Sequence, residues 1–219
     1  MVSLPFKDRG QAGELLADEL ATRAIGAEAV VVALTRGGVP VAAAVAQRLR
    51  LELDIIVVRK LGVPWQPELA LGAVAGGELI LDNETIQALE VPDEEIERIA
   101  ATERAKMQAR EQLFRKGLPA IDLRGRPLIL IDDGVATGST MLAALRSVRR
   151  QKPSKVIVAI PVASREARRQ LSDEADDLVC LAAPEPFIAV GEWYRDFSQV
   201  EDEEVCSLIG RRPDSNPGG

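Results

Sequence analysis

The sequence predicts an α/β protein with a doubly wound, mainly parallel sheet. Short runs rich in Val and Ile alternate along the chain with segments whose apolar residues recur every three or four positions. The runs predict buried strands and the segments predict helices, so the alternation favours strand-helix-strand units with helices on both faces of one sheet. At 219 residues, the chain is long enough to bury a core of its own.

The elements follow in order along the chain. Strands are expected at residues 29–34, 53–58, 128–131, 155–160 and 177–181, and helices at 11–23, 39–49, 140–150 and 165–172. Residues 72–81 predict two short strands or a hairpin around Gly76 and Gly77. Residues 93–116 predict a long polar helix with Asp93 as its N-cap, and we interpret it as a solvated helix without a catalytic role. Its expected buried stripe is Ile96, Ile99, Met107 and Phe114.

Composition excludes several kinds of site. The chain has 27 Lys and Arg against 34 Asp and Glu, a net charge of -7, and no His. Histidine-based triads and zinc sites are therefore excluded, and Cys180 and Cys206 have no CxxC spacing. An acidic chain poor in aromatic residues does not predict nucleic acid as a partner.

The chain also predicts no membrane partner. No apolar stretch approaches the ~20 residues that span a bilayer. The first ten residues lack the pattern of a signal peptide. We therefore expect a cytoplasmic protein.

Residues 128–140 carry the most informative pattern, LILIDDGVATGST. A buried strand delivers Asp132 and Asp133 to the carboxyl edge of the sheet, where ligands of such folds bind. Their side chains should point to opposite sides of the strand, so that one accepts hydrogen bonds from a vicinal diol and the other faces a reacting centre or a hydrated cation. The next loop places N–H groups and hydroxyls at a helix N-terminus, which suits a phosphate. The stretch therefore predicts a sugar phosphate site, and it matches neither a P-loop nor GxGxxG.

This stretch resembles the diphosphoribosyl-binding signature of the type I phosphoribosyltransferases. The resemblance implies transfer of ribose 5-phosphate from phosphoribosyl pyrophosphate (PRPP) to a nitrogenous base, with Mg²⁺ and release of pyrophosphate. It implies that Asp132 and Asp133 bind the ribose hydroxyls, directly or through the water shell of the metal. The 5-phosphate would be held by Ala136, Thr137, Gly138, Ser139 and Thr140. The resemblance extends over residues 6–209, and the layout looks closest to a bacterial branch of predicted phosphoribosyltransferases.

Two further segments resemble the family's anion site. Thr35, Arg36, Gly37 and Gly38 follow the first strand and match the pyrophosphate loop, in which a cis peptide would fall between Thr35 and Arg36. Arg59 and Lys60 resemble the Arg-Lys pair placed beside the pyrophosphate. Arg36, Arg59, Lys60 and Mg²⁺ would stabilise negative charge on the leaving pyrophosphate, while the two aspartates face the positive anomeric carbon.

Residues 61–71 would then be a lid. Trp65 either shields the site from water or packs against a neighbouring helix or chain. Glu68 is the only acid in this segment, and we take it as the candidate acid or base, as in the adenine and orotate branches. Ala136 stands where the 6-oxopurine branch has an aspartate, and residues 160–164 lack that branch's lysine, so hypoxanthine or guanine transfer is disfavoured.

Residues of about 184–200 resemble the small C-terminal hood that covers the base. Phe187 matches the stacking aromatic, and Asp196 matches the hood's acid more loosely. Trp193, Tyr194 and Phe197 predict either a wall that binds a ring or a local packing cluster, and the sequence leaves both open.

The expected organisation is one phosphoribosyltransferase-like domain over residues 1–210, with a disordered tail at 211–219. Two other functions stay open: a non-catalytic PRPP-binding regulatory protein, and a hydrolase or phosphorylase-like enzyme acting on the same kind of compound. The sequence leaves the oligomeric state open; a homodimer is the commonest assembly for such a chain, and the helix at 93–116 is a candidate interface.

Overall fold

The structure is a computed structural model that describes residues 2–63 and 65–210, apart from the side chains of residues 66–69. The tail predicted at 211–219 lies outside the described residues.

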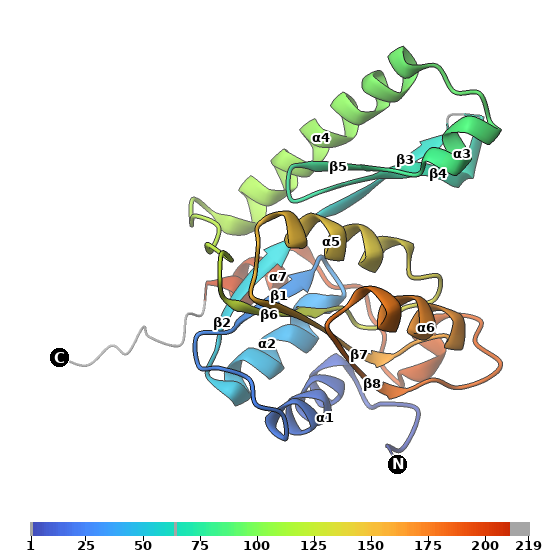
Figure 1. The fold of residues 1–219 in the computed structure, drawn as a ribbon. Coiled ribbons are helices and arrows are strands. Elements are labelled where there is room, and N and C mark those ends of the chain that lie inside the picture. Colours follow the sequence, from blue (N-terminus) through green and yellow to red (C-terminus); the bar gives the residue numbers. More distant parts are fainter. Residues whose placement is uncertain (1, 64, 211–219) are drawn as a thin grey trace.

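A five-stranded parallel sheet forms the centre of the molecule (Figure 1). Its strands, in spatial order, are β2 (Glu52–Ile56), β1 (Val30–Leu34), β6 (Pro127–Ile131), β7 (Lys155–Val162) and β8 (Asp177–Ala182). Every neighbouring pair runs parallel, so the predicted sheet is confirmed. The strand order reverses between β1 and β6, and such a switch point opens a crevice at the carboxyl ends of the two strands.

Helices cover both faces of this sheet (Figure 1). They are α1 (Arg9–Ala21), α2 (Gly38–Leu49) and α7 (Asp202–Ile209) on one face, and α5 (Ser139–Arg150) and α6 (Arg165–Glu174) on the other. Successive side chains of β1 point to opposite faces of the sheet. Val31 and Ala33 pack toward α1 and α2, whereas Val30 and Val32 pack toward α5. All of these strand residues are buried, which explains their continuous apolar sequence.

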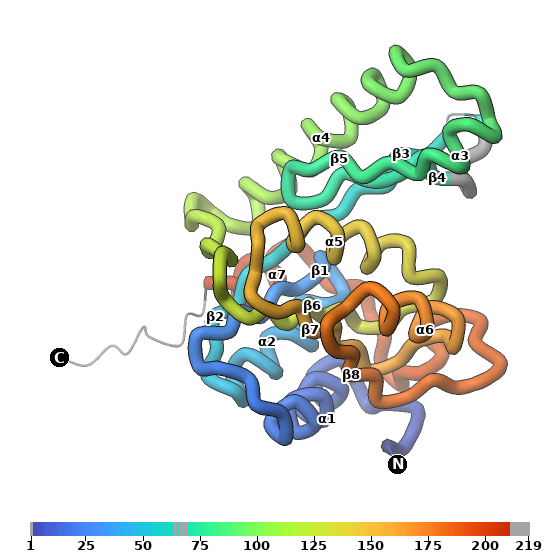
Figure 2. The backbone as a smooth tube through the Cα atoms, in the orientation of Figure 1, coloured from blue at the N-terminus to red at the C-terminus, as the bar shows by residue number. Residues whose placement is uncertain are grey.

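Residues 58–115, which we call the arm, leave the five-stranded sheet after β2 and lie over α5 (Figure 2). The arm contains an antiparallel sheet of β3 (Val58–Val63), β4 (Gln66–Ala75) and β5 (Glu78–Leu81), followed by α3 (Asn83–Ala88) and α4 (Asp93–Arg115). The buried hydroxyl of Ser147 on α5 donates a hydrogen bond of 2.6 Å to the carbonyl of Ala75, which fastens the arm to the core.

The arm confirms some predictions and corrects others. The hairpin around Gly76 and Gly77 is confirmed, because both glycines have positive φ between β4 and β5. The prediction that the second strand reaches Val58 is wrong, since β2 ends at Ile56. Arg59 and Lys60 do not follow a strand but lie inside β3, opposite Val74 and Ala73. Sequence periodicity cannot detect this change from one sheet to another, because the apolar run continues through it.

The predicted long helix is also confirmed, and its four stripe residues are buried. The assignment of Asp93 as N-cap is wrong: Pro92 holds that position, without a side-chain cap, and Asp93 is the first helical residue. The helices α3 and α7 were not predicted. They have six and eight residues, which is too short for a clear apolar periodicity.

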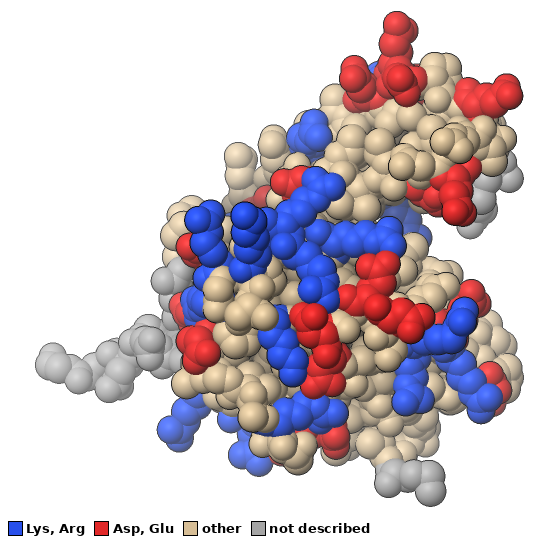
Figure 3. All heavy atoms as spheres, viewed as in Figure 1, with Lys and Arg blue, Asp and Glu red and all other residues tan. Residues whose placement is uncertain are grey.

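Within the described residues, no helix combines the length and apolar character needed to cross a bilayer. On the face seen in Figure 3, acidic side chains gather at the end of α4 farthest from the five-stranded sheet, where Asp93, Glu94 and Glu95 form the first turn. Over the body of this face, both signs of charge are interspersed.

Candidate functional site

The turn after β1 lies directly against the acidic pair that follows β6. A Cβ atom on Gly37 would overlap the carboxylate of Asp133, and one on Gly38 would come within 2.9 Å of the Cα atom of Asp132. Only glycine permits this approach. The predicted cis peptide between Thr35 and Arg36 is present. Strands β1 and β6 are neighbours, so the sheet itself brings the two predicted motifs together.

Asp133 is buried and has partners from distant parts of the chain. Nε of Arg9 donates to its Oδ2 at 2.8 Å, and both side chains are 11% exposed. The hydroxyl of Tyr194 donates to the backbone carbonyl of Asp133 at 2.5 Å. Asp132, which is half-buried, accepts from the backbone N–H of Asp133 at 2.9 Å.

The two carboxyl groups have unusual proton affinities. Burial raises the pKa of Asp132 well above its ordinary value, and the neighbouring Asp133 charge raises it further. Burial also raises the pKa of Asp133, while the Arg9 guanidinium opposes that rise. Arg9 therefore makes Asp133 the more readily ionised member of the pair.

The predicted phosphate loop forms a cup at the start of α5. Gly138 holds the N-cap position with a φ of 86°, and no side chain caps the helix. The first N–H groups of such a helix have no partner within the helix and attract an anion. The hydroxyls of Thr137 and Ser139 lie 3.2 Å apart at this end, and Ser164 fixes the loop by donating to the carbonyl of Ala136 at 2.6 Å.

Two of the three predicted cations have carboxylate partners on the helices. Nη1 of Arg36 contacts Asp202 of α7 at 3.2 Å, and Arg110 of α4 binds both oxygens of the same carboxylate at 2.6 Å. Arg59 binds Glu103 of α4 through Nε at 2.9 Å and Nη2 at 2.8 Å. Lys106 binds the other oxygen of Glu103 at 2.6 Å. Burial acts to raise the pKa of Glu103, but the hydrogen bonds from Lys106 and Arg59 outweigh it and hold the pKa below its ordinary value.

The third cation, Lys60, is exposed and helps to line a cavity of about 450 Å³ between the arm and α5. Ser139 of the cup lies on the opposite wall of this cavity. The cavity therefore places one predicted pyrophosphate residue and one predicted 5-phosphate residue around a common space.

The hood residues divide into two groups. Tyr194 is buried against Phe6 and Phe197, with ring centroids 5.4 and 5.1 Å away, and the guanidinium of Arg9 lies 3.9 Å from the centre of the Phe197 ring. For Tyr194 and Phe197, the packing interpretation is therefore supported. Phe187 and Trp193 form a second aromatic pair, with ring centroids 6.0 Å apart, which packs against this cluster and is only partly buried. The hood covers the acidic strand end, because a Cβ atom on Gly134 would collide with Val190.

The predicted lid residues have different positions. Trp65 lies at the turn between β3 and β4 and is 60% exposed. Glu68 belongs to β4, but its side chain lies outside the described residues. Asp196 is exposed, and a hydrogen bond from the backbone N–H of Ser198 lowers its pKa. The roles of these three residues stay predictions.

The model of the phosphoribosyl transferase domain matches residues 8–195, which include the acidic strand end, the cup and both cationic segments. The chain belongs to the phosphoribosyl transferase family. A protein of Mycobacterium tuberculosis H37Rv, which is provisionally named a phosphoribosyl transferase, is 41% identical to this chain over 207 residues. The match covers 94% of this chain but 46% of that protein, so the chain spans about half the length of this relative.

Two solved structures share this fold. A crystal structure from Thermus thermophilus has 45% sequence identity and a TM-score of 0.84, and the match covers 94% of this chain and 98% of that one. A purine phosphoribosyltransferase from Pyrococcus horikoshii has 15% identity and a TM-score of 0.50, with 88% and 92% of the two chains covered, and it supports the fold alone.

Several contacts of the candidate site escaped sequence reasoning. Arg9, Glu103, Arg110 and Asp202 were not predicted. Arg9 begins α1, and the carboxylates of Glu103 and Asp202 sit on helices that look like ordinary charged helices. The nearest signal was the mixture of Glu with Lys and Arg at helical spacing on α4, which is also typical of a solvated surface.

The side chains at the acidic strand end fit Mg²⁺ in one arrangement only, in which the ion keeps part of its water shell. Among the described residues, no group of three or more His, Cys, Asp or Glu side chains is arranged to hold a metal. Mg²⁺ is usually held by one or two carboxylates together with water and substrate phosphates. Asp132 and Asp133 supply two carboxylates beside the predicted phosphate positions, so these residues fit a magnesium ion that arrives with the substrate and keeps part of its water shell.

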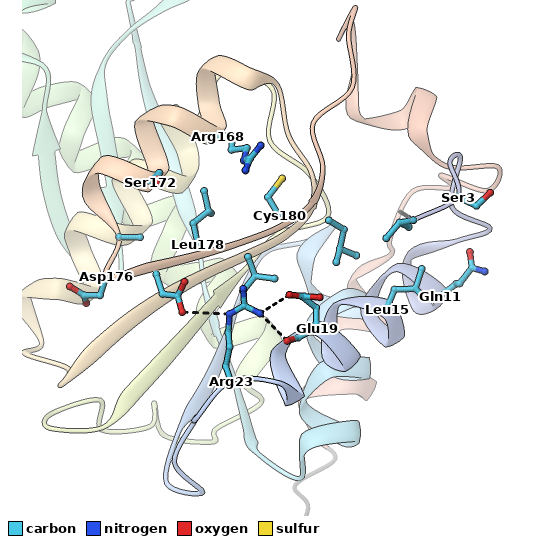
Figure 4. Close-up of a pocket in the computed structure, with 15 residues that line it drawn as sticks. Ser3, Gln11, Leu15, Glu19, Arg23, Arg168, Ser172, Asp176, Leu178 and Cys180 are labelled. Carbon is cyan, nitrogen blue, oxygen red and sulfur yellow. Dashed lines mark hydrogen bonds and ion pairs between the residues drawn. The ribbon is translucent and has the colours of Figure 1, made fainter.

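A larger cavity, of about 960 Å³, lies elsewhere on the molecule, along β8 between α1 and α6 (Figure 4). Arg23 and Glu19 pair within it at 2.9 Å. Among the described residues that line it, none belongs to the predicted site. The size of a cavity therefore does not identify the candidate site. The site is identified by the sequence motifs that meet at the ends of β1 and β6.

Proposed function

We propose that this protein transfers ribose 5-phosphate from PRPP to a nitrogenous base and releases pyrophosphate. The observation that carries the proposal is the close approach of Gly37 and Gly38 to Asp133 and Asp132 at the switch point of the sheet. The uncapped start of α5 follows the same acidic strand end. This arrangement provides separate positions for pyrophosphate, ribose hydroxyls and a terminal phosphate.

In the proposed reaction, the bond between the anomeric carbon and pyrophosphate weakens before the base attacks. Positive charge grows on the sugar ring, and negative charge grows on the leaving group. Asp132 and Asp133 accept hydrogen bonds from the ribose hydroxyls and stabilise the positive ring. Arg36, Arg59, Lys60 and the N–H groups of the loop at 35–38 bind the pyrophosphate. The loop at 136–140 holds the 5-phosphate and fixes the sugar against the acidic pair.

Asp132 and Asp133 would hold a Mg²⁺ ion through water, and the ion would neutralise part of the phosphate charge. This magnesium dependence is part of the proposal. With both carboxyl groups ionised, one Arg9 guanidinium faces two carboxylates, and the net charge left on the pair is of the sign that a cation requires.

The acceptor base is assigned to the hood, residues 184–200. Phe187 and Trp193 pack against the buried Tyr194 cluster but are only partly buried, which supports them as the rings that contact a planar base. Nε1 of Trp193 is buried and has no hydrogen-bond partner among the described residues. Glu68 is retained as the proposed acid or base, and Ala136 as the residue that disfavours 6-oxopurines.

The test is release of pyrophosphate from PRPP and Mg²⁺ across a panel of nitrogenous bases, with the Asp133→Asn variant as control. Release with one base, lost in the variant, would establish the activity and name the acceptor. PRPP binding without turnover on any base would instead support a regulatory PRPP-binding protein. Slow release with water alone would support the hydrolase.

Two further parts of the proposal concern the setting of the reaction. Cys180 and Cys206 are both free thiols, which is typical of the cytoplasm. A homodimer stays a prediction, and sedimentation of the purified protein checks it. Because the relative described above is about twice as long, activity and partners of the whole protein belong to the proposal as well.

A further inference from the structure

Two clusters with the same pattern of charges connect the predicted pyrophosphate residues to α4. In the first, Glu103 is shared by Arg59 of β3 and Lys106 of α4. In the second, Asp202 of α7 is shared by Arg36 of the turn after β1 and Arg110 of α4. We call these clusters the two triads. Each has two cations and one carboxylate, so each retains one positive charge.

The triads stand on a firmly packed helix. The positions 103, 106 and 110 are three and four residues apart, so they lie along one side of α4. The same helix is anchored by buried Ile96, Met107 and Phe114, and the Arg110 guanidinium lies 5.6 Å from the centre of the Phe114 ring. The side chain of Glu103 is 13% exposed, which leaves it little freedom to move. The side chains of α4 can therefore hold their partners in the triads, Arg59 of β3 and Asp202 of α7, in one orientation.

We infer that Glu103 and Asp202 are positioning residues, which orient Arg59 and Arg36 for a pyrophosphate group and make α4 part of the binding machinery. This inference rests on the proposed function and extends it to residues outside the family signature. A free arginine side chain has many rotamers, and a ligand that must order it loses affinity. A carboxylate that orders the guanidinium beforehand removes that cost.

The geometry favours positioning over blocking of the site. Asp202 contacts Arg36 through Nη1, and Glu103 contacts Arg59 through Nε and Nη2, so each guanidinium keeps further N–H donors outside these hydrogen bonds. The excess positive charge of each triad also attracts an anion. A blocking carboxylate would have to neutralise its cations, and here each carboxylate is outnumbered.

The test compares two ligands by isothermal titration calorimetry of the full chain: inorganic pyrophosphate, which probes the cations, and ribose 5-phosphate, which probes the acidic pair and the cup. The variants are Glu103→Ala, Glu103→Gln, Asp202→Ala and Asp202→Asn. The matched control is Glu95→Ala, because Glu95 also lies on α4 and binds a cation three residues away, Arg98, at 2.6 Å. Circular dichroism and a thermal melt check that each variant folds.

We expect both alanine variants to weaken pyrophosphate binding by about fivefold to tenfold, the cost of ordering one long side chain. The amide variants should recover most of this loss, because an amide oxygen still accepts from the guanidinium. Ribose 5-phosphate affinity should not change, and Glu95→Ala should change neither affinity.

Other results would overturn the inference. Tighter pyrophosphate binding in the variants would mean that the carboxylates compete with the ligand. Unchanged binding would remove the positioning role, and equal weakening of both ligands would indicate general disruption of the fold. If the unaltered protein bound neither ligand, the proposed function itself would fail with the inference. If it bound both, and the variants did so equally well, only the inference would fail.

Discussion

The two sides of the candidate site hold charge in opposite proportions. On the acidic side, the ion pairs of the described residues give Asp132 and Asp133 one cation, Arg9. On the cationic side, each of the two carboxylates, Glu103 and Asp202, meets two cations. The acidic side is buried and built from β6, α1 and the hood, whereas the cationic side is more exposed and depends on the arm and α7.

This difference shows how one site serves two kinds of ligand group. A sugar that develops positive charge suits a buried pair with a negative excess, because low polarity strengthens the attraction. A polyphosphate must bind and then dissociate. Exposed cations suit such a group, because they are already partly solvated and their return to water on release costs less free energy. The contrast predicts that acidic-side changes affect the reaction rate and stability, and that cationic-side changes affect affinity.

The largest expected effect is on turnover. Asp133→Asn should lower kcat for pyrophosphate release by about 10²- to 10³-fold, because the charge of the Asp133 carboxylate stabilises the sugar most strongly in the transition state.

Arg59→Met should act mainly through the KM for PRPP, because Arg59 binds pyrophosphate before and during the reaction. Steady-state kinetics of both variants with the true acceptor measures the split. If Asp133→Asn kept most of its kcat, the acidic side would have no role in the chemical step.

The next effect concerns the buried ion pair. Arg9→Ala should lower the free energy of unfolding by about 3 kcal/mol, because it leaves the Asp133 carboxylate buried without its cation. Denaturant titration measures this change. Arg48→Ala is the matched control, since its pair with Asp18 is exposed and should contribute less than about 1 kcal/mol.

A double variant tests whether the cost of Arg9→Ala comes from the stranded charge. Adding Asp133→Asn to Arg9→Ala should restore part of the lost stability, because no buried charge then lacks a partner. Losses that simply add would instead indicate that Arg9 stabilises the protein through Phe197 and the carbonyl of Ser198.

A smaller effect is expected from the pH dependence of stability. The folded protein raises the pKa of Asp132, so ionisation favours the unfolded chain. The stabilising effect of the protonated form is complete below the unfolded pKa of about 3.9 and is lost as the pH rises through the raised pKa of the folded state. Asp132→Asn should therefore raise the free energy of unfolding at pH 8 by about 1 kcal/mol. Denaturant titrations from pH 5 to pH 8 should show a flatter profile for the variant, and parallel profiles would contradict the prediction.

The smallest effect is expected on the cationic side. Glu103→Gln should change the free energy of unfolding by less than about 1 kcal/mol, because its partner Arg59 is 40% exposed and such pairs contribute little to stability. Chemical denaturation of this variant beside Arg9→Ala makes the comparison direct. A loss as large as that of Arg9→Ala would mean that the triads stabilise the fold rather than prepare the site.

Sequence reasoning succeeded where a signal lies within one stretch of chain. The strand at 128–131, the acids after it and the loop at 136–140 form one continuous pattern, and the structure confirms the strand before the acids and the helix that begins in the loop. The turn at 35–38 met the acidic pair because parallel neighbours end at one edge. The exit from β2 into β3 was misplaced, because Val57 and Val58 continue the apolar run while the chain changes sheets.

By itself, the sequence determined the parallel sheet, the acidic pair, the cup and the family, since periodicity and motifs are properties of neighbouring residues. Only the tertiary structure decided which charges meet. Arg9 and Asp133 are 124 residues apart, Arg36 and Asp202 are 166 apart, and Arg59 and Glu103 are 44 apart. A charged residue at a helix surface looks the same in sequence whether it faces water or a partner, and its partner is fixed only when the packed core brings the two surfaces together.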